Sequence, residues 1–137
     1  MSRFRIEIDH SHRINRLSVL ADLDVSGLKE MMAALWKSAG FDPAYATLLD
    51  MTRVSLHSLD FEALREFFTW TLEHDPRRGS IGVAIGESPA SAAIGKMIDA
   101  LRDIMGVSRH RALRHFTGID EAQRWLATTV PPAKAKR

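Results

Sequence analysis

Hydroxyl, carboxyl and glycine residues follow two short apolar segments of the chain, at about 45–51 and 80–86. The residues at or after the ends of these segments are Asp50, Thr52, Ser55, Ser58, Gly86, Glu87 and Ser88. Such side chains can hydrogen-bond a polar or anionic ligand, and a carboxylate can also act as an acid or base. If both segments are parallel strands, their carboxyl ends meet where open α/β sheets bind ligands and helix N-termini converge. We take these residues, with Glu87 only as a neighbour, as candidates for a ligand-binding or switch site.

A purely structural interpretation of the same residues stays open. Ser58 and Ser88 stand where helices are expected to begin, so their hydroxyls could cap those helices. Asp50 and Thr52 could satisfy backbone groups of the loop that follows the first segment. No Ser-His-Asp set or pair of carboxylates can be assembled from the sequence, so we assign no catalytic residue.

Two basic or glycine-containing stretches also invite comparison with known sites. The stretch 86–96 resembles a phosphate loop, but Ala90 replaces a required glycine and Met97 stands where a hydroxyl should hold magnesium. The basic cluster 109–115 could meet an anionic partner, but a charge-protected edge strand explains it better. Neither stretch leads us to expect a nucleotide or another cofactor.

His10 and His12 have a spacing that is compatible with a shared metal ion. The sequence indicates no third ligand, and the residues fall in a short polar turn between two alternating segments. We therefore expect a solvated turn and no metal site.

The segment 45–51 is the centre of the expected fold. It is apolar, too short for a typical helix, and bordered by the turn residues 41–43 and by Ser58 and Asp60. These features predict a strand that is buried on both faces in the middle of a parallel sheet. The segment 80–86 predicts a second buried strand, and 111–116 predicts a last strand at an edge.

The N-terminal quarter alternates apolar and polar residues. Phe4, Ile6 and Ile8 lie on one face of a first segment, and the alternation resumes after residues 9–12 from Leu17 to Leu23. This period of two predicts an antiparallel hairpin.

Four helices are expected between and after these strands. The first covers about 27–39 after Ser26 as N-cap, and the second begins after Ser58 or Asp60 and ends before Pro76. The third follows Ser88 and Pro89, and the fourth opens at a capping-box-like stretch, 117–120. The first helix has a wide apolar surface, which we expect to face the core, and an exposed remainder would mark a dimer or ligand groove. It comprises Leu28, Met31, Met32, Leu35 and Trp36.

The order β-β-α-β-α-β-α-β-α predicts a single α/β domain with a mixed sheet, in which an antiparallel hairpin precedes parallel strands. We expect this domain to cover 1–128 and a disordered basic tail to cover 129–137. The chain has 137 residues, 19 Lys and Arg, 17 Asp and Glu, and no cysteine. Without Lys134, Lys136 and Arg137 the remainder has 16 basic and 17 acidic residues, so we expect no nucleic-acid surface. No apolar run has the length of a transmembrane segment, and the lack of cysteine fits a cytoplasmic protein.

The element order and the strand end Leu48-Leu-Asp-Met-Thr52 resemble the anti-sigma-factor-antagonist fold, the STAS or SpoIIAA-like group, over residues 4–127. The stretch 116–126 is similar to the closing strand and helix of small uncharacterised bacterial members. In signalling members a kinase phosphorylates a serine in an Asp-Ser-Ser-Gly-Leu-like stretch after this strand. Here the corresponding stretch, 54–61, contains Ser55 and Ser58 but lacks the glycine and the paired serines.

We expect a non-enzymatic regulatory or binding module that acts through a protein partner, a second copy of itself, or a small apolar or anionic ligand. One alternative, implied by the resemblance, is a phosphorylation-controlled antagonist with Ser55 or Ser58 as the acceptor. The second alternative is a small enzyme that uses the strand-end crevice, with Asp50 as acid or base.

Overall fold

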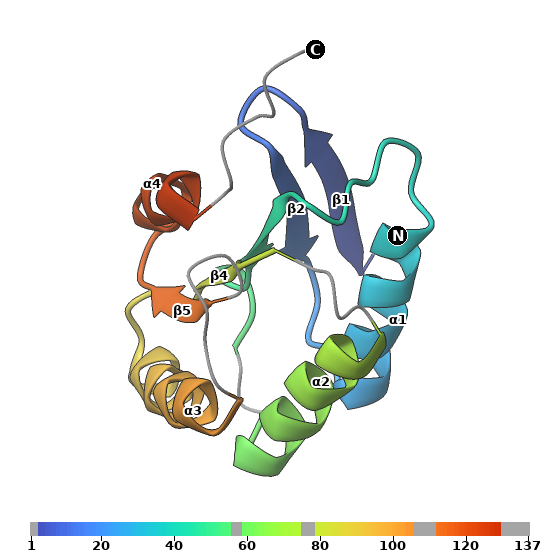
Figure 1. The fold of residues 1–137 in the computed structure, drawn as a ribbon. Coiled ribbons are helices and arrows are strands. Elements are labelled where there is room, and N and C mark those ends of the chain that lie inside the picture. Colours follow the sequence, from blue (N-terminus) through green and yellow to red (C-terminus); the bar gives the residue numbers. More distant parts are fainter. Residues whose placement is uncertain (1–2, 56–58, 75–78, 106–111, 130–137) are drawn as a thin grey trace.

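The computed structural model describes residues 3–55, 59–74, 79–105 and 112–129, and its elements follow the predicted order (Figure 1). The strands are β1 (Phe4–Asp9), β2 (Ile14–Val19), β3 (Ala46–Asp50), β4 (Ile81–Ala84) and β5 (Leu113–Phe116). The helices are α1 (Val25–Trp36), α2 (Phe61–His74), α3 (Pro89–Met105) and α4 (Ile119–Thr129). The α/β class and the element order are therefore confirmed.

The sheet has the strand order β1-β2-β3-β4-β5. The β1–β2 pair is antiparallel and the other pairs are parallel, as predicted, with Leu17 opposite Leu49 and Leu49 opposite Val83. Every residue of β3 is buried, which confirms the predicted central strand. β5 pairs only with β4 among the described residues, which confirms its edge position.

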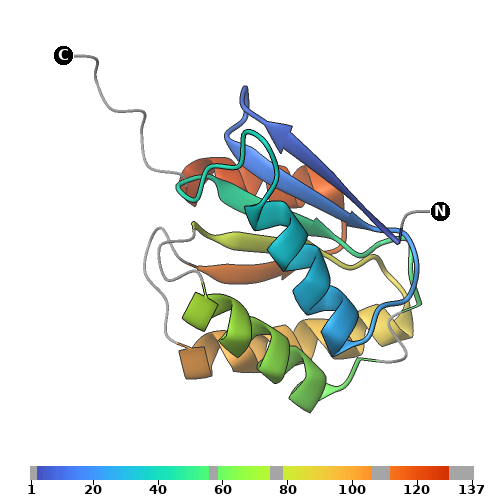
Figure 2. The ribbon, with the colours of Figure 1, turned by 90° about the vertical axis from the view of Figure 1, so that its right-hand side faces the viewer.

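Helices cover the two faces of the sheet unequally. Figures 1 and 2 show α1, α2 and α3 together on one face and α4 on the other. The larger core lies under the three helices and contains Leu49, Met31, Phe67 and Ile98. A smaller core lies under α4, where Leu126 packs with residues of β2 and β3. α4 packs mainly on β3, β4 and β5, so the hairpin extends beyond the helix on this face.

Two predicted boundaries in the N-terminal half differ from the structure. α1 begins after Asp24, whose carboxylate accepts the Gly27 N–H at 2.8 Å, so the prediction of Ser26 as N-cap is wrong. α1 ends at Trp36, before the predicted position 39. β2 ends at Val19, short of the predicted Leu23, because the chain leaves the sheet there and leads into α1.

The other helix starts agree with capping chemistry to different degrees. Asp60 accepts the Ala63 N–H at 2.8 Å and begins α2. Ser88 accepts the Ser91 N–H at 3.1 Å directly before Pro89, as predicted for α3. At α4 the Thr117 hydroxyl donates to the Glu121 carboxylate, so the predicted capping box with residue 120 does not form. α4 continues through residue 129, where we expected the tail to begin, and residues 130–137 lie outside the described part.

Candidate functional site

A pocket of about 360 Å³ lies at the carboxyl ends of β3 and β4. The candidate residues Thr52, Ser55, Gly86 and Ser88 all line it, and they come from the two loops that follow these strands. Its other walls combine polar and apolar side chains. They are Val54, Ile85, Glu87, Pro89, Ala90 and Ser91.

The conformation of the loop from β4 to α3 depends on Gly86 and on the cap of α3. Gly86 has a φ of 83°, in the left-handed region that glycine enters without steric cost. Its N–H donates to the carbonyl of Thr117 at 3.0 Å. Ser91 donates its hydroxyl to the Ile85 carbonyl, and the Ser88 and Ser91 hydroxyls lie 2.8 Å apart. Ser88 therefore both caps α3 and lines the pocket.

Asp50 belongs to the turn after β3 and not to the pocket wall. Its side chain is 5% exposed, and Oδ1 accepts the Thr52 N–H at 2.9 Å and the Thr52 hydroxyl at 2.6 Å. The carboxylate thus satisfies the loop backbone, as the structural interpretation proposed. This position gives Asp50 no direct access to a ligand in the pocket.

Ser55 connects two loops at the same end of the molecule. It is exposed, its N–H donates to Asp22 Oδ1 at 3.1 Å, and its hydroxyl donates to Asp22 Oδ2 at 2.9 Å. Asp22 belongs to the loop between β2 and α1, so this contact ties that loop to the one after β3. Ser58, the other candidate acceptor, lies outside the described residues.

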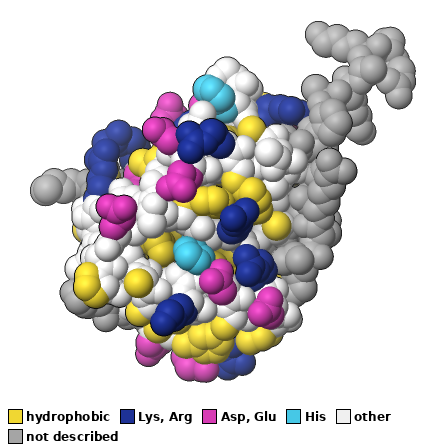
Figure 3. Space-filling view, turned by 90° about the vertical axis from the view of Figure 1, so that its left-hand side faces the viewer, with side chains coloured by type: hydrophobic (Ala, Val, Ile, Leu, Met, Phe, Trp, Pro, Cys, Tyr) yellow, Lys and Arg dark blue, Asp and Glu magenta, His cyan; other side chains and the backbone are white. Residues whose placement is uncertain are grey.

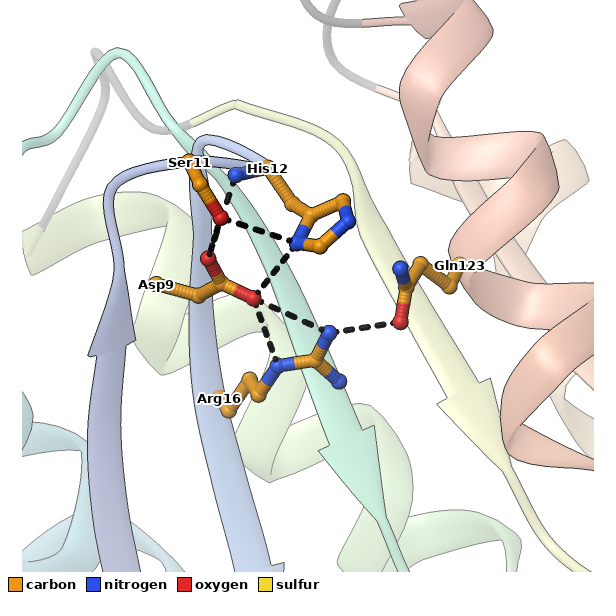
Figure 4. Close-up of polar contacts among 5 residues, drawn as sticks. All are labelled: Asp9, Ser11, His12, Arg16 and Gln123. Atoms are coloured by element: carbon orange, nitrogen blue, oxygen red, sulfur yellow. Dashed lines mark hydrogen bonds and ion pairs between the residues drawn. The ribbon is translucent and has the colours of Figure 1, made fainter.

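A second polar cluster, at the β1–β2 turn, was not predicted as a site (Figure 4). Asp9 Oδ1 accepts the Ser11 hydroxyl at 2.8 Å, while Oδ2 lies 2.8 Å from His12 Nδ1 and 3.2 Å from Arg16 Nη2. Arg16 also donates to Gln123 of α4. Partial burial alone would raise the pKa of Asp9, but the hydrogen bonds from Ser11, His12 and Arg16 together hold it well below its usual range.

The two histidines of this turn have different partners. His10 Nδ1 lies 2.9 Å from the Tyr45 hydroxyl, and the two rings meet edge to face. His12 lies against Asp9. The turn setting is therefore confirmed, and no group of three potential metal ligands gathers within the described parts of the chain. The contact with Gln123 spans 107 positions in sequence, which is why local patterns gave no signal for this cluster.

The apolar surface of α1 faces the core, as expected, and the groove between α1 and α2 combines charged and apolar side chains. Met31 and Met32 are buried in the core, and the groove of about 630 Å³ is lined largely by charged side chains. Lys29 pairs with Glu66 at 2.7 Å across it. Trp70 adds apolar surface to the groove and stacks on Trp36 with ring centroids 5.3 Å apart.

The edge strand β5 carries a polar side chain on each of its faces. Arg114 lies over the rings of Phe116 and Trp125, at 5.2 and 5.9 Å from their centroids, and His115 lies 3.2 Å from Asp99 of α3. Figure 3 shows basic, acidic and histidine side chains interspersed with hydrophobic ones on the face that carries β5, α3 and α4. This arrangement fits the predicted charge protection of the edge. Residues 109–111 of the basic cluster lie outside the described residues.

No model of a known protein family matches the sequence, and no curated protein is similar enough to count as a match. Within residues 3–55, 59–74, 79–105 and 112–129, no helix has both the length and the apolar character needed to cross a membrane.

Proposed function

We propose that the protein is a non-enzymatic binding module of a regulatory kind and that the strand-end pocket is its ligand site. The observation that carries this proposal is the convergence of Thr52, Ser55, Gly86 and Ser88 around one pocket at the ends of two adjacent strands. Its volume of about 360 Å³ lies within the range of pockets that hold small molecules. Asp50, the one acid or base considered for catalysis, is engaged by Thr52, which favours binding over chemistry.

The walls of the pocket define the class of ligand. Val54, Ile85 and Pro89 offer apolar surface, whereas the hydroxyls and the N-terminus of α3 favour hydrogen-bond acceptors and negative charge. Glu87 lies on the wall and disfavours a highly charged anion. A small, partly apolar molecule with one acidic or carbonyl group fits these walls, and so does a side chain of a protein partner.

The resemblance to SpoIIAA-like proteins, which rests on the element order and on the strand end Leu48–Thr52, is the ground for proposing a regulatory role. A protein partner, including a second copy of the chain, belongs to this proposal. The lack of cysteine supports a cytoplasmic setting for it.

Native mass spectrometry of the protein purified from its own cells tests the ligand site. We expect a retained small molecule in the wild type and its loss in Ala90→Phe, because Ala90 lines the pocket and a phenyl ring would fill it. Ala93→Phe is the matched control, since Ala93 is an exposed residue of the same helix outside the pocket wall. A wild-type protein with neither a small molecule nor a bound partner, or equal retention in both variants, contradicts the proposal.

A second candidate function is a phosphorylation switch at Ser55. It is favoured by the exposure of Ser55 and by its hydrogen bonds to Asp22. A phosphate on this hydroxyl would place about two negative charges beside the Asp22 carboxylate and would separate the two loops. The denatured mass and peptide mapping of the same preparation test it, and a chain with no phosphate on Ser55 or Ser58 under the conditions of growth contradicts it.

A further inference from the structure

Four hydroxyl groups belong to residues that line the strand-end pocket, those of Thr52, Ser55, Ser88 and Ser91. Considered by residue type alone, hydroxyls suit a ligand that accepts hydrogen bonds, because each one carries a proton. A hydroxyl has only that one proton, and once it is engaged the oxygen offers nothing but lone pairs. The directions of the existing hydrogen bonds therefore decide which kind of group a ligand must present.

The hydroxyl protons of Thr52 and Ser55 are held by carboxylates. Thr52 donates to Asp50 Oδ1 at 2.6 Å, and Ser55 donates to Asp22 Oδ2 at 2.9 Å. An ionised carboxylate can only accept, so the direction of both bonds is fixed. Such bonds are about twice as strong as bonds between neutral groups, so a neutral acceptor on a ligand competes poorly for these protons. Within the described part of the chain, no donor takes up the lone pairs of either hydroxyl oxygen.

The hydroxyl protons of Ser88 and Ser91 form a chain that ends on a backbone carbonyl. Ser91 donates its proton to the Ile85 carbonyl. Because that proton is used, the contact of 2.8 Å between the two hydroxyls is a donation from Ser88 to Ser91. Ser88 also accepts the Ser91 N–H at 3.1 Å and so keeps one lone pair. Neither serine has a hydroxyl proton left for a ligand.

The start of α3 offers few backbone donors to the pocket. Pro89 has no N–H, and the Ser91 N–H is taken by Ser88. The Ala90 N–H lies in the first helical turn, where no intrahelical carbonyl is available, and no acceptor among the described residues binds it. Since Ala90 also lines the pocket, its N–H can receive one acceptor atom of a ligand.

Carboxylates lie around the same pocket. Glu87 is on its wall, and Asp22 and Asp50 lie directly behind two of the hydroxyls. No Lys or Arg is among the described residues that line it, and the side chain of Arg53, in the same loop, is exposed to solvent. A negatively charged ligand would be repelled by these carboxylates and would find few donors to offset the repulsion. Of the acidic and carbonyl groups that suit the walls by residue type, the hydrogen bonds therefore favour the carbonyl.

We propose, on the basis that the strand-end pocket is the ligand site, that its ligand is a neutral small molecule with a carboxamide group on an apolar body. The carboxamide oxygen accepts the Ala90 N–H, and the carboxamide N–H groups donate to the hydroxyl oxygens of Thr52 and Ser55. The apolar body lies against Val54 and Ile85. A carboxamide combines donors and an acceptor in one neutral group, whereas a carboxylate or a ketone supplies acceptors only.

The test is an NMR titration of the ¹⁵N-labelled full chain at pH 7 with probes of closely similar shape, namely isovaleramide, isovalerate and methyl isobutyl ketone. Only the first of them has N–H donors beside its carbonyl. We expect isovaleramide to give saturable shifts of the backbone amides of residues 52–55 and 86–91. It should bind at least about fivefold more tightly than either of the other probes, because each N–H donor adds a hydrogen bond that they lack.

Variants of the hydroxyl residues separate hydrogen bonding from packing. Thr52→Val removes one acceptor oxygen and keeps the shape of the side chain. It should weaken isovaleramide binding by about threefold or more and leave ketone binding within about twofold, because the ketone has no proton for that oxygen. Ser55→Ala should act in the same direction, so the test does not depend on the folding of one variant. Thr69→Val is the matched control, since Thr69 is an exposed residue of α2 outside this pocket, and it should leave the amide affinity within about twofold.

The outcomes distinguish the carboxamide from the pocket itself. Isovalerate or the ketone binding at residues 52–55 and 86–91 as tightly as the amide would overturn the carboxamide assignment and leave the pocket a ligand site. Amide shifts elsewhere in the chain, or no shifts at all, would also overturn the assignment, and native mass spectrometry then decides separately whether the pocket holds another ligand. Equal weakening by Thr52→Val and Thr69→Val would remove the assigned role of the Thr52 oxygen and, with it, the proposal.

Discussion

Replacing Gly82 by alanine should test how closely α4 is packed on the sheet. Gly82 lies on β4 on the face that α4 covers, and a Cβ at this position would lie 3.1 Å from both Cγ and Cδ1 of Leu126. Leu126 is fully buried, so it cannot move outward without displacing α4. The added methyl group must therefore be accommodated by strain or by a shift of the helix.

The size of the effect follows from two opposed contributions. Overpacking a tight core contact costs about 1–3 kcal/mol, whereas alanine in a strand is better than glycine by about 0.5–1 kcal/mol. We expect Gly82→Ala to lower the free energy of unfolding by about 1–2 kcal/mol. Leu126→Ala alone leaves a cavity and should cost about 2–5 kcal/mol. In the double variant the new methyl group occupies part of that cavity. The decrease in its free energy of unfolding should therefore be smaller, by about 1 kcal/mol or more, than the sum of the decreases in the two single variants.

Urea unfolding of the wild type, both single variants and the double variant measures this coupling directly. The control is Gly95→Ala in α3, whose Cβ would lie even closer to a neighbour, 2.7 Å from His115 Cε1. His115 is 29% exposed and its ring can move, and alanine is favoured inside a helix, so this variant should lose no stability. A Gly82→Ala variant as stable as wild type, or strict additivity with Leu126→Ala, would refute the close packing of α4 on β4.

Two other expectations concern the N-terminal half of the chain. The lowered pKa of Asp9 means that the folded state binds fewer protons there than the unfolded state. Its stabilising effect should be complete above the unfolded pKa of about 3.9 and be lost as pH falls further. The stability difference between wild type and Asp9→Asn, from urea unfolding at several pH values, should therefore shrink below pH ~4, and a constant difference would contradict this account. In the same assay Asp24→Ala should lower the free energy of unfolding by about 0.5–2 kcal/mol and Ser26→Ala by less than ~0.5 kcal/mol. A larger loss in Ser26→Ala than in Asp24→Ala would indicate that Ser26 is the N-cap.

The strands and their order in the chain could be predicted because each one has a local pattern. The apolar segment around Leu48 is short and has no polar face, and only a central strand covered on both sides needs that composition. The alternation of Phe4, Ile6 and Ile8 likewise follows from a strand with one covered face. Both patterns arise because buried positions hold apolar residues and exposed positions hold polar ones, and this can be read from the sequence at each residue.

Helix ends and polar contacts were predicted less well because several local solutions are equivalent. Asp24 and Ser26 are both good capping residues two positions apart, and only the backbone path decides which carboxylate or hydroxyl meets a free N–H. At the strand-end pocket the sequence placed Thr52, Ser55 and Ser88 at the correct end of the sheet. It could not show that Asp50 turns away to bond the Thr52 backbone.

One architectural feature accounts for both the polar face of the hairpin and the pocket beside it. A single helix on the second face of a five-stranded sheet lies mainly over β3, β4 and β5. On that face the hairpin carries Arg5 and Glu7, which are exposed, and Arg16, which bridges to Gln123. A hydrophobic contact at this position would have closed the space between the turn and α4. The contacts there are instead polar: Asp9 pairs with Arg16, both are partly buried, and a pocket of about 450 Å³ lies between the hairpin turn and α4.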